Sequence, residues 1–308
     1  MSTEPSDRTI VLNLLRGAVP ERDTELCQLW KANGHAVEVV ASSPGVKMDA
    51  TDKRIQFDPK TIDLFWLIGF SFWRSIEVYS PAIAVATCTN TSLEKALSID
   101  EERGLYEADF RQLIAAGQEL IAESRSDDFE WPESVPLPTT DSDSLGDVQD
   151  KAAADLVALA LAFALLHELK HVTFRLEGRE KDMPRNEEEM ACDTWARAFM
   201  TEKVADYARK NGHEYMIVAQ KRAMGIALAG AIIHAMTAPN DRWGSEDYPP
   251  LCERLRAIFD GHTLPDNSSF WTFAACILVA LLRQQHVRLD FKATTHKEMV
   301  DRLFAELG

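Results

Sequence analysis

The chain has 308 residues, 46% of them hydrophobic, which is enough apolar material for a sizeable core and argues against overall disorder. Asp and Glu outnumber Lys and Arg by 49 to 33, and the resulting formal net charge of -16 repels phosphate backbones and anionic membrane surfaces. The composition therefore predicts neither a nucleic-acid-binding protein nor a membrane protein.

The N-terminal region is predicted to mix strands and helices. The stretches "RTIVLNLL" (8–15) and "AVEVVAS" (36–42) are rich in the β-branched residues typical of strands. Between them, "ERDTELCQLWKANG" (21–34) has helical spacing and ends on a glycine. This order predicts a small β-α-β opening. In the aromatic-rich stretch 63–86, a glycine and a proline break the pattern, so helix and strand both remain open.

From residue 92 onwards the predicted elements are helical, apart from a Ser-, Asp- and Pro-rich stretch at 124–147 whose residues break regular structure. The fold is therefore predicted to be α+β and predominantly α-helical. We expect an N-terminal α/β region (1–125), a linker or long surface loop (126–146) and a helical domain (147–308). The helices predicted beyond the loop lie at 148–176, 187–210, 213–237, 249–260 and 268–306, with a break near Asp290.

Cysteine usage and the N-terminal sequence both bear on the compartment. The five cysteines are scattered and form no Cys-x-x-Cys pair, which favours a reducing environment. The opening "MSTEPSDRTIVLNLL" shows no secretion signal, and the longest apolar run, 152–166, is short for a bilayer. We expect a cytoplasmic protein in which 152–166 is a buried helix.

The motif with the most specific chemistry is His-Glu-x-x-His in "LLHELKHV" (165–172). On a helix, His167 and His171 lie one turn apart on one face and can direct imidazole nitrogens at a single metal ion. Glu168 is rotated by about 100° from His167, beside the open position of such a metal, where it can take a proton from water. Because the pattern also arises by chance, a third ligand is needed to decide.

Glu189 and Asp193, in "NEEEMACD" (186–193), are the candidates that complete the site. Their i, i+4 spacing puts two like charges on one helical face, which disfavours a helix unless a positive charge lies beside them. Zn²⁺ held by the two histidines and Glu189 would supply that charge, and Asp193 would accept the second ring N–H of a ligand histidine. Alternatively, Asn186 caps the helix and Glu189 only fills the capping-box position.

Three stretches in chain order, "HELKH", "EMACD" and "YPPLCERL", resemble the gluzincin metallopeptidases, whose pattern is His-Glu-x-x-His, Glu-x-x-x-Asp and His-Pro-x-x-x-x-Arg. The resemblance implies a zincin-like helical core. Tyr248 stands where that pattern has a histidine beside the reacting carbonyl, so the residue that contacts the oxyanion is open between Tyr248 and Arg254. Tyr248 also fits an ordinary helix entry with proline in the first turn, and Arg254 also fits a structural role.

Size, acidity and the context of "HELKHV" are most similar to the Lit-type phage-exclusion peptidases of bacteria. The resemblance covers about 147–262 and is weak over the first 125 residues. It implies a cytoplasmic peptidase that cleaves translation elongation factor Tu after a phage-derived activator appears. The zinc site follows from spacing, whereas this substrate follows from the resemblance alone.

Other readings of the sequence stay open. The chain could be a repressor-cleaving regulatory metallopeptidase, although no helix-turn-helix is evident, or a zinc-stabilised sensor or binding protein without catalysis. The intact Glu168 favours an enzyme. His234 could reach the metal cleft, or it could be a core histidine or a helix C-terminal charge.

An unrestrained endopeptidase would damage its own cell, so we expect selective, partner-gated cleavage. The sequence offers two means: the 124–147 loop could cover the cleft, and the aromatic-rich 63–86 region could dock a partner.

Overall fold

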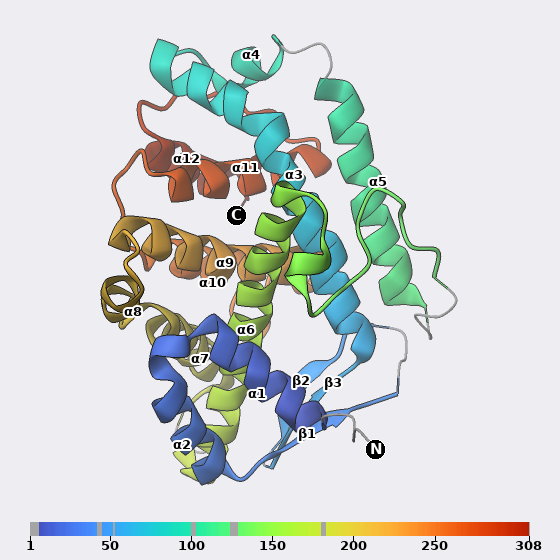
Figure 1. Ribbon diagram of the computed structural model, residues 1–308. Coiled ribbons are helices and arrows are strands. Elements are labelled where there is room, and N and C mark those ends of the chain that lie inside the picture. The colour runs from blue at the N-terminus through green and yellow to red at the C-terminus, as the bar shows by residue number, and fades with distance from the viewer. Residues whose placement is uncertain are drawn as a thin grey trace.

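The structure is a computed structural model that describes residues 6–41, 45–51, 53–99, 103–123, 129–179 and 183–307. Helices form most of it, and a small sheet lies among the N-terminal elements (Figure 1), which confirms the predicted α+β, predominantly helical class. The helices are α1 (Asp7–Ala18), α2 (Asp23–Asn33), α3 (Pro59–Thr89), α4 (Leu93–Leu97), α5 (Arg103–Ala122), α6 (Val148–Leu176), α7 (Arg185–Thr201), α8 (Val204–Asn211), α9 (Tyr215–Met236), α10 (Leu251–Asp260), α11 (Ser269–Gln284) and α12 (His296–Leu307). The strands are β1 (Ala36–Val39), β2 (Met48–Thr51) and β3 (Arg54–Phe57).

The predicted β-α-β opening is wrong in its first element, because residues 8–15 belong to helix α1. Val11, Leu15 and Ala18 are the buried positions of α1, and their spacing of four and three residues is helical. The β-branched content of this stretch concealed that period. The predicted helix ending at Gly34 and the strand after it are present as α2 and β1.

The sheet has the order β1-β3-β2. β3 pairs in parallel with β1 and antiparallel with β2, so that Ile55 lies opposite both Val37 and Ala50. The sheet packs against α1 and α6. β2 is an edge strand, and β3 is its one pairing partner within the described parts of the chain.

Residues 63–86, where the sequence left helix and strand open, form part of the single helix α3, which contains Pro81. α3 packs against α5, α6, α9 and α11, so helices from both sides of the 126–146 segment share one hydrophobic core. Phe65, Trp66, Phe70 and Phe72 are buried in that core. These aromatic side chains therefore do not form an exposed docking surface.

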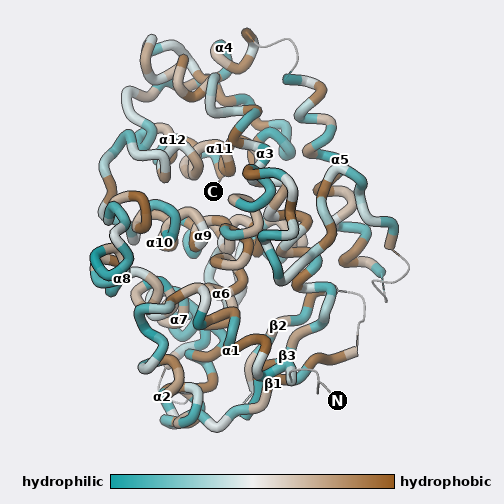
Figure 2. The backbone as a smooth tube through the Cα atoms, in the orientation of Figure 1, coloured by the Kyte–Doolittle hydropathy of each residue, from teal (hydrophilic) through white to brown (hydrophobic). Residues whose placement is uncertain are grey.

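Beyond the loop, the observed helices lie where they were predicted, except that the predicted helix 187–210 is divided into α7 and α8. α6 has the predicted bounds, 148–176, and Asp147 caps it by accepting a hydrogen bond from the Gln149 amide (2.6 Å). α6 and α9 are long and apolar enough to cross a membrane by length and composition alone, but most of each apolar window is buried within the protein. Hydrophilic residues predominate instead at peripheral elements such as α8 (Figure 2).

The close approach of α6 and α9 depends on Gly225, because a Cβ at this position would overlap the Leu159 side chain. We expect Gly225→Ala to lower the free energy of unfolding by about 1–3 kcal/mol through overpacking. Gly17→Ala, at a helical position with no atom within 4 Å of an added Cβ, is the control and should be neutral or stabilise by up to about 1 kcal/mol. Urea denaturation measures both. Equal effects of the two substitutions would contradict the packing explanation.

Candidate metal centre

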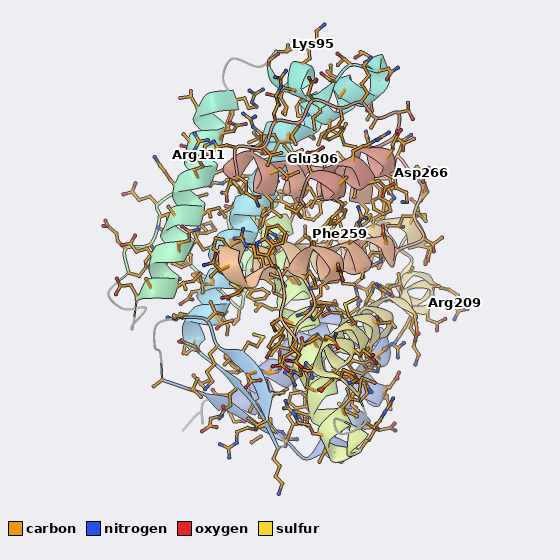
Figure 3. All side chains as sticks on the ribbon, turned by 180° about the vertical axis from the view of Figure 1, so that it is seen from behind. Lys95, Arg111, Arg209, Phe259, Asp266 and Glu306 are labelled. Carbon is orange, nitrogen blue, oxygen red and sulfur yellow. The ribbon has the colours of Figure 1, made fainter. Side chains whose placement is uncertain are left out.

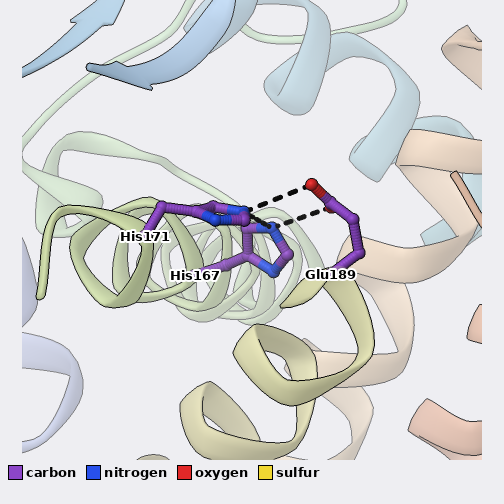
Figure 4. A group of neighbouring side chains, drawn as sticks. All are labelled: His167, His171 and Glu189. Atoms are coloured by element: carbon purple, nitrogen blue, oxygen red, sulfur yellow. Dashed lines mark hydrogen bonds and ion pairs between the residues drawn. The ribbon is translucent and has the colours of Figure 1, made fainter. Parts of the chain in front are cut away.

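His167 and His171 on α6 converge with Glu189 on α7 (Figure 4). The two Nε2 atoms are 3.0 Å apart, and each lies 3.3 Å from a carboxylate oxygen of Glu189. One ligand atom from each residue lies within 4.8 Å of the other two, and all three residues are buried. The packing of α7 on α6 thus brings the three predicted ligands together.

Carboxylates orient both imidazole rings. Asp193 accepts from Nδ1 of His167 (2.8 Å), and Glu188 accepts from Nδ1 of His171 (2.5 Å). Nδ1 of each ring then carries the proton, so each Nε2 carries a lone pair. Because the two Nε2 atoms face one another, a further proton or a metal ion between them is needed to avoid repulsion of these lone pairs. The donor set therefore fits a divalent metal such as zinc.

Two arginines supply positive charge that sequence reasoning assigned to zinc alone. Arg254 donates to Asp193 through Nε (2.8 Å) and Nη2 (3.0 Å), and its Nη1 lies 3.1 Å from Glu189. Arg185 also pairs with Glu189 (3.2 Å) and lies 3.6 Å from Glu188. Sequence reasoning missed Arg185 and Glu188. Their i, i+3 spacing on the helix that carries Glu189 was the available signal.

The neighbouring charges shift the pKa values of His167 and Glu189 in opposite directions. Burial alone lowers the pKa of His167, but the Asp193 and Glu189 carboxylates outweigh it and raise this pKa to about 10. Burial raises the pKa of the Glu189 carboxyl, and its contacts with both histidines and Arg254 reverse this and hold that pKa well below its usual range. Without a bound cation the site would hold a proton at neutral pH, and metal binding would release it.

The capping-box reading of Glu189 does not agree with the structure. α7 begins at Arg185 after Pro184, and no side chain caps it. Asn186 lies inside the helix, where its side chain accepts from the Glu187 amide (2.8 Å). The Glu189 carboxylate instead faces the histidines and arginines.

A cleft of about 420 Å³ opens onto this group. Glu168 lines it and is partly exposed, and Tyr248, 49% exposed, stands at its wall with its ring 5.8 Å from the Arg185 guanidinium. Burial raises the pKa of the Glu168 carboxyl, while His167 and His171 oppose that shift. Met48 and Asp49 of strand β2 also line the cleft, which no sequence signal indicated.

Two other sequence candidates do not line the cleft. None of residues 129–147 of the predicted covering loop lines the cleft, and Pro136 O within this segment accepts from Trp66 Nε1 of α3 (2.8 Å). Residues 124–128 of that loop lie outside the described residues. His234 is buried and faces a different cavity.

The fold and the site define a helical protein with a buried His-His-carboxylate group, which is a donor set of metal-dependent hydrolases. A match to the peptidase U49 family spans residues 55–274, and the chain therefore belongs to this family of peptidases. The match begins in β3 and ends in α11, so it extends well beyond the motif-bearing part of the sequence. Neither the curated proteins nor the solved structures gave a significant match.

We expect Asp193→Asn and Glu188→Gln each to weaken zinc binding by roughly 10- to 100-fold, because each removes a carboxylate that orients a ligand histidine. Competition with a chromogenic zinc chelator measures the affinity. Unchanged affinity in either variant would assign that carboxylate a structural role only.

Proposed function

We propose that this chain is a zinc-dependent endopeptidase that cleaves a specific intracellular protein. The observation that carries the proposal is the convergence of His167, His171 and Glu189 beside Glu168 in an open cleft. Membership of the peptidase U49 family supports hydrolysis of a peptide bond as the reaction.

Zinc, when bound there, supplies a Lewis acid for the scissile carbonyl and for the attacking water. Glu168 takes the proton from that water and delivers it to the leaving amine nitrogen. The raised pKa of the Glu168 carboxyl suits both steps, because a base whose pKa lies closer to neutrality also returns the proton readily.

The two candidates for the oxyanion differ in their surroundings. Arg254 is engaged by Asp193 and Glu189, so we assign it a positioning role. Tyr248 stands at the cleft wall beside Arg185, and its hydroxyl is the better candidate to donate to the substrate carbonyl oxygen.

The edge strand β2 favours a polypeptide substrate. Its Met48 and Asp49 line the cleft, and the edge of β2 away from β3 has no pairing strand within the described residues. An extended peptide can add to such an edge through main-chain hydrogen bonds, with its scissile bond over the metal group.

The test is intact-mass proteomics of cell extract incubated with purified protein, compared with a Glu168→Gln control. A small set of cleaved proteins, absent from the control, supports a selective endopeptidase. A zinc-loaded protein that cleaves nothing under any condition, including in phage-infected extract, would favour the sensor or binding-protein alternative.

We further propose elongation factor Tu as the substrate and a phage-derived factor as the activator, in the cytoplasm. The motif resemblance supports this, since Lit-type peptidases are members of the U49 family. Purified elongation factor Tu should be cut only when phage-infected lysate is added. If it stays intact while another protein is cut, the substrate assignment is wrong and the peptidase assignment stands.

A further inference from the structure

A second cavity, of about 670 Å³, lies next to the C-terminal end of α9 and the start of α10. His234 of α9 and Arg256 of α10 line it, whereas Thr237 and Arg254 line the metal-site cleft. The second cavity and the metal-site cleft are therefore lined by neighbouring residues of the same two helices, α9 and α10, and of the residues that follow α9. The charged and aromatic residues of this second cavity are His234, Arg242, Trp243, Glu253, Arg256 and Phe304.

Two arginines in this cavity have no acidic partner in the described part of the chain, although the net charge of the protein is -16. Arg242 Nε donates to the Thr237 carbonyl (2.9 Å), and burial lowers the pKa of Arg242 with no carboxylate to offset it. The Arg256 guanidinium lies over the Phe304 ring, 5.2 Å from its centroid. Both therefore keep N–H donors for an external anion.

His234 adds a buried polar group that the fold leaves unsatisfied. It is 4% exposed, and its Nδ1 has no hydrogen-bond partner among the described residues. Burial and the nearby Arg242 lower the pKa of His234 to about 4, so the ring is neutral at physiological pH and has one N–H to donate. Unpaired buried polar atoms are costly, and His234 is one of the residues that line the cavity.

Trp243 contributes an exposed aromatic ring to the cavity wall. It is 73% exposed, although a tryptophan side chain gains free energy when its ring is covered. It follows Arg242 directly in the chain, so an indole face and a guanidinium stand together at the cavity. A flat ring attached to an anion fits this pair.

We propose that this cavity binds a phosphate-bearing small molecule with a planar ring, such as a nucleoside diphosphate. Arg242 and Arg256 bind the phosphates, His234 donates one hydrogen bond, and Trp243 stacks on the ring. The volume lies within the range of small-molecule sites, roughly 300–1,000 Å³. Glu253 also lines the cavity and opposes an anionic ligand, so the two arginines must outweigh its charge.

The occupant would contact the loop that carries Tyr248. Within this loop the Arg242 carbonyl accepts from the Leu251 amide (2.9 Å), and the Tyr248 carbonyl accepts from the Ser245 amide (2.7 Å). Gly244 has φ +80°, and a Cβ there would lie 2.7 Å from the Tyr248 carbonyl oxygen, so the turn requires glycine. An effect of the ligand on Tyr248 rests on the proposed function, whereas the binding itself does not.

Calorimetric titration of the full-length protein with ADP and with pyrophosphate, at low ionic strength, tests the site. Arg256→Gln should weaken ADP binding by about tenfold or more, because it removes one charged donor from an exposed side chain. Arg209→Gln is the matched control: it makes the same charge change on α8, 82% exposed, at the edge of the molecule (Figure 3). It should alter ADP affinity by less than about twofold.

Two more variants sharpen the result. Trp243→Leu should remove the preference for ADP over pyrophosphate, and equal wild-type affinities for the two ligands would overturn the ring-stacking part. His171→Ala, which disrupts the metal centre, should keep ADP affinity, and its loss would move the binding to the metal. No measurable binding of either ligand at about 1 mM, or equal weakening by Arg209→Gln and Arg256→Gln, would overturn the site.

Discussion

Replacing Glu168 with glutamine is expected to leave zinc bound and to lower turnover of the cleaved protein by about 10²-fold or more. Glutamine keeps the size of the side chain but cannot accept and return the proton. Glu168 is not among the three residues that converge as metal ligands, so the metal content should not change. Zinc analysis and the rate of product formation, followed by mass spectrometry, measure the two quantities.

Glu177→Gln is the matched control for this change, because Glu177 is exposed and lies at the C-terminal end of the same helix. It should retain both zinc and activity. Undiminished proteolysis by the Glu168→Gln protein would show that another group serves as the base, while loss of zinc would mean that Glu168 supports the metal directly.

Removing one of the three metal ligands, in contrast to Glu168→Gln, should lower the zinc content of the protein. We expect wild-type protein to hold about one zinc ion per chain and Glu189→Ala or His171→Ala to lose most of it, since each leaves two of three protein ligands. In both variants the remaining buried charges lose their central partner, so thermal stability should also fall. Metal analysis after gel filtration and a melting curve with and without chelator measure these effects.

The acidic run that begins α7 offers its own controls. Glu187 is exposed, Glu188 orients His171, and Glu189 faces both imidazole Nε2 atoms. Alanine at Glu187 should therefore leave zinc binding unchanged, alanine at Glu188 should weaken it, and alanine at Glu189 should remove most of the zinc. Full zinc occupancy in the Glu189→Ala protein would reject the ligand assignment.

The sequence by itself determined the features that depend on neighbours along the chain. The bounds of α6 follow from its continuous apolar run and from Asp147 as a helix cap. The facing of His167 and His171 follows from the i, i+4 period of that helix, and the same period placed Glu189 and Asp193 on one face of α7. Helical spacing is a local property, so these relations were readable before any packing was known.

Local patterns were misleading where they conflicted or were incomplete. Residues 8–15 combine β-branched side chains with a helical spacing of apolar ones, and their packing on α6 selected the helix. The loop before α6 precedes the site in sequence, yet none of its described residues lines the cleft, and Pro136 within it contacts Trp66 of α3 instead.

The tertiary structure alone decided which groups surround the metal ligands. Arg254 reaches Asp193 across 61 residues of chain, and β2 brings Met48 and Asp49 to the cleft from the N-terminal part of the sequence. These contacts depend on how α10 and the sheet pack against α7 and α6. Side-chain spacing along one element carries no information about the distance to another, so the three donors and Asp193 could be predicted from sequence, whereas the contacts of Glu188 and Arg185 and the lining of the cleft could not.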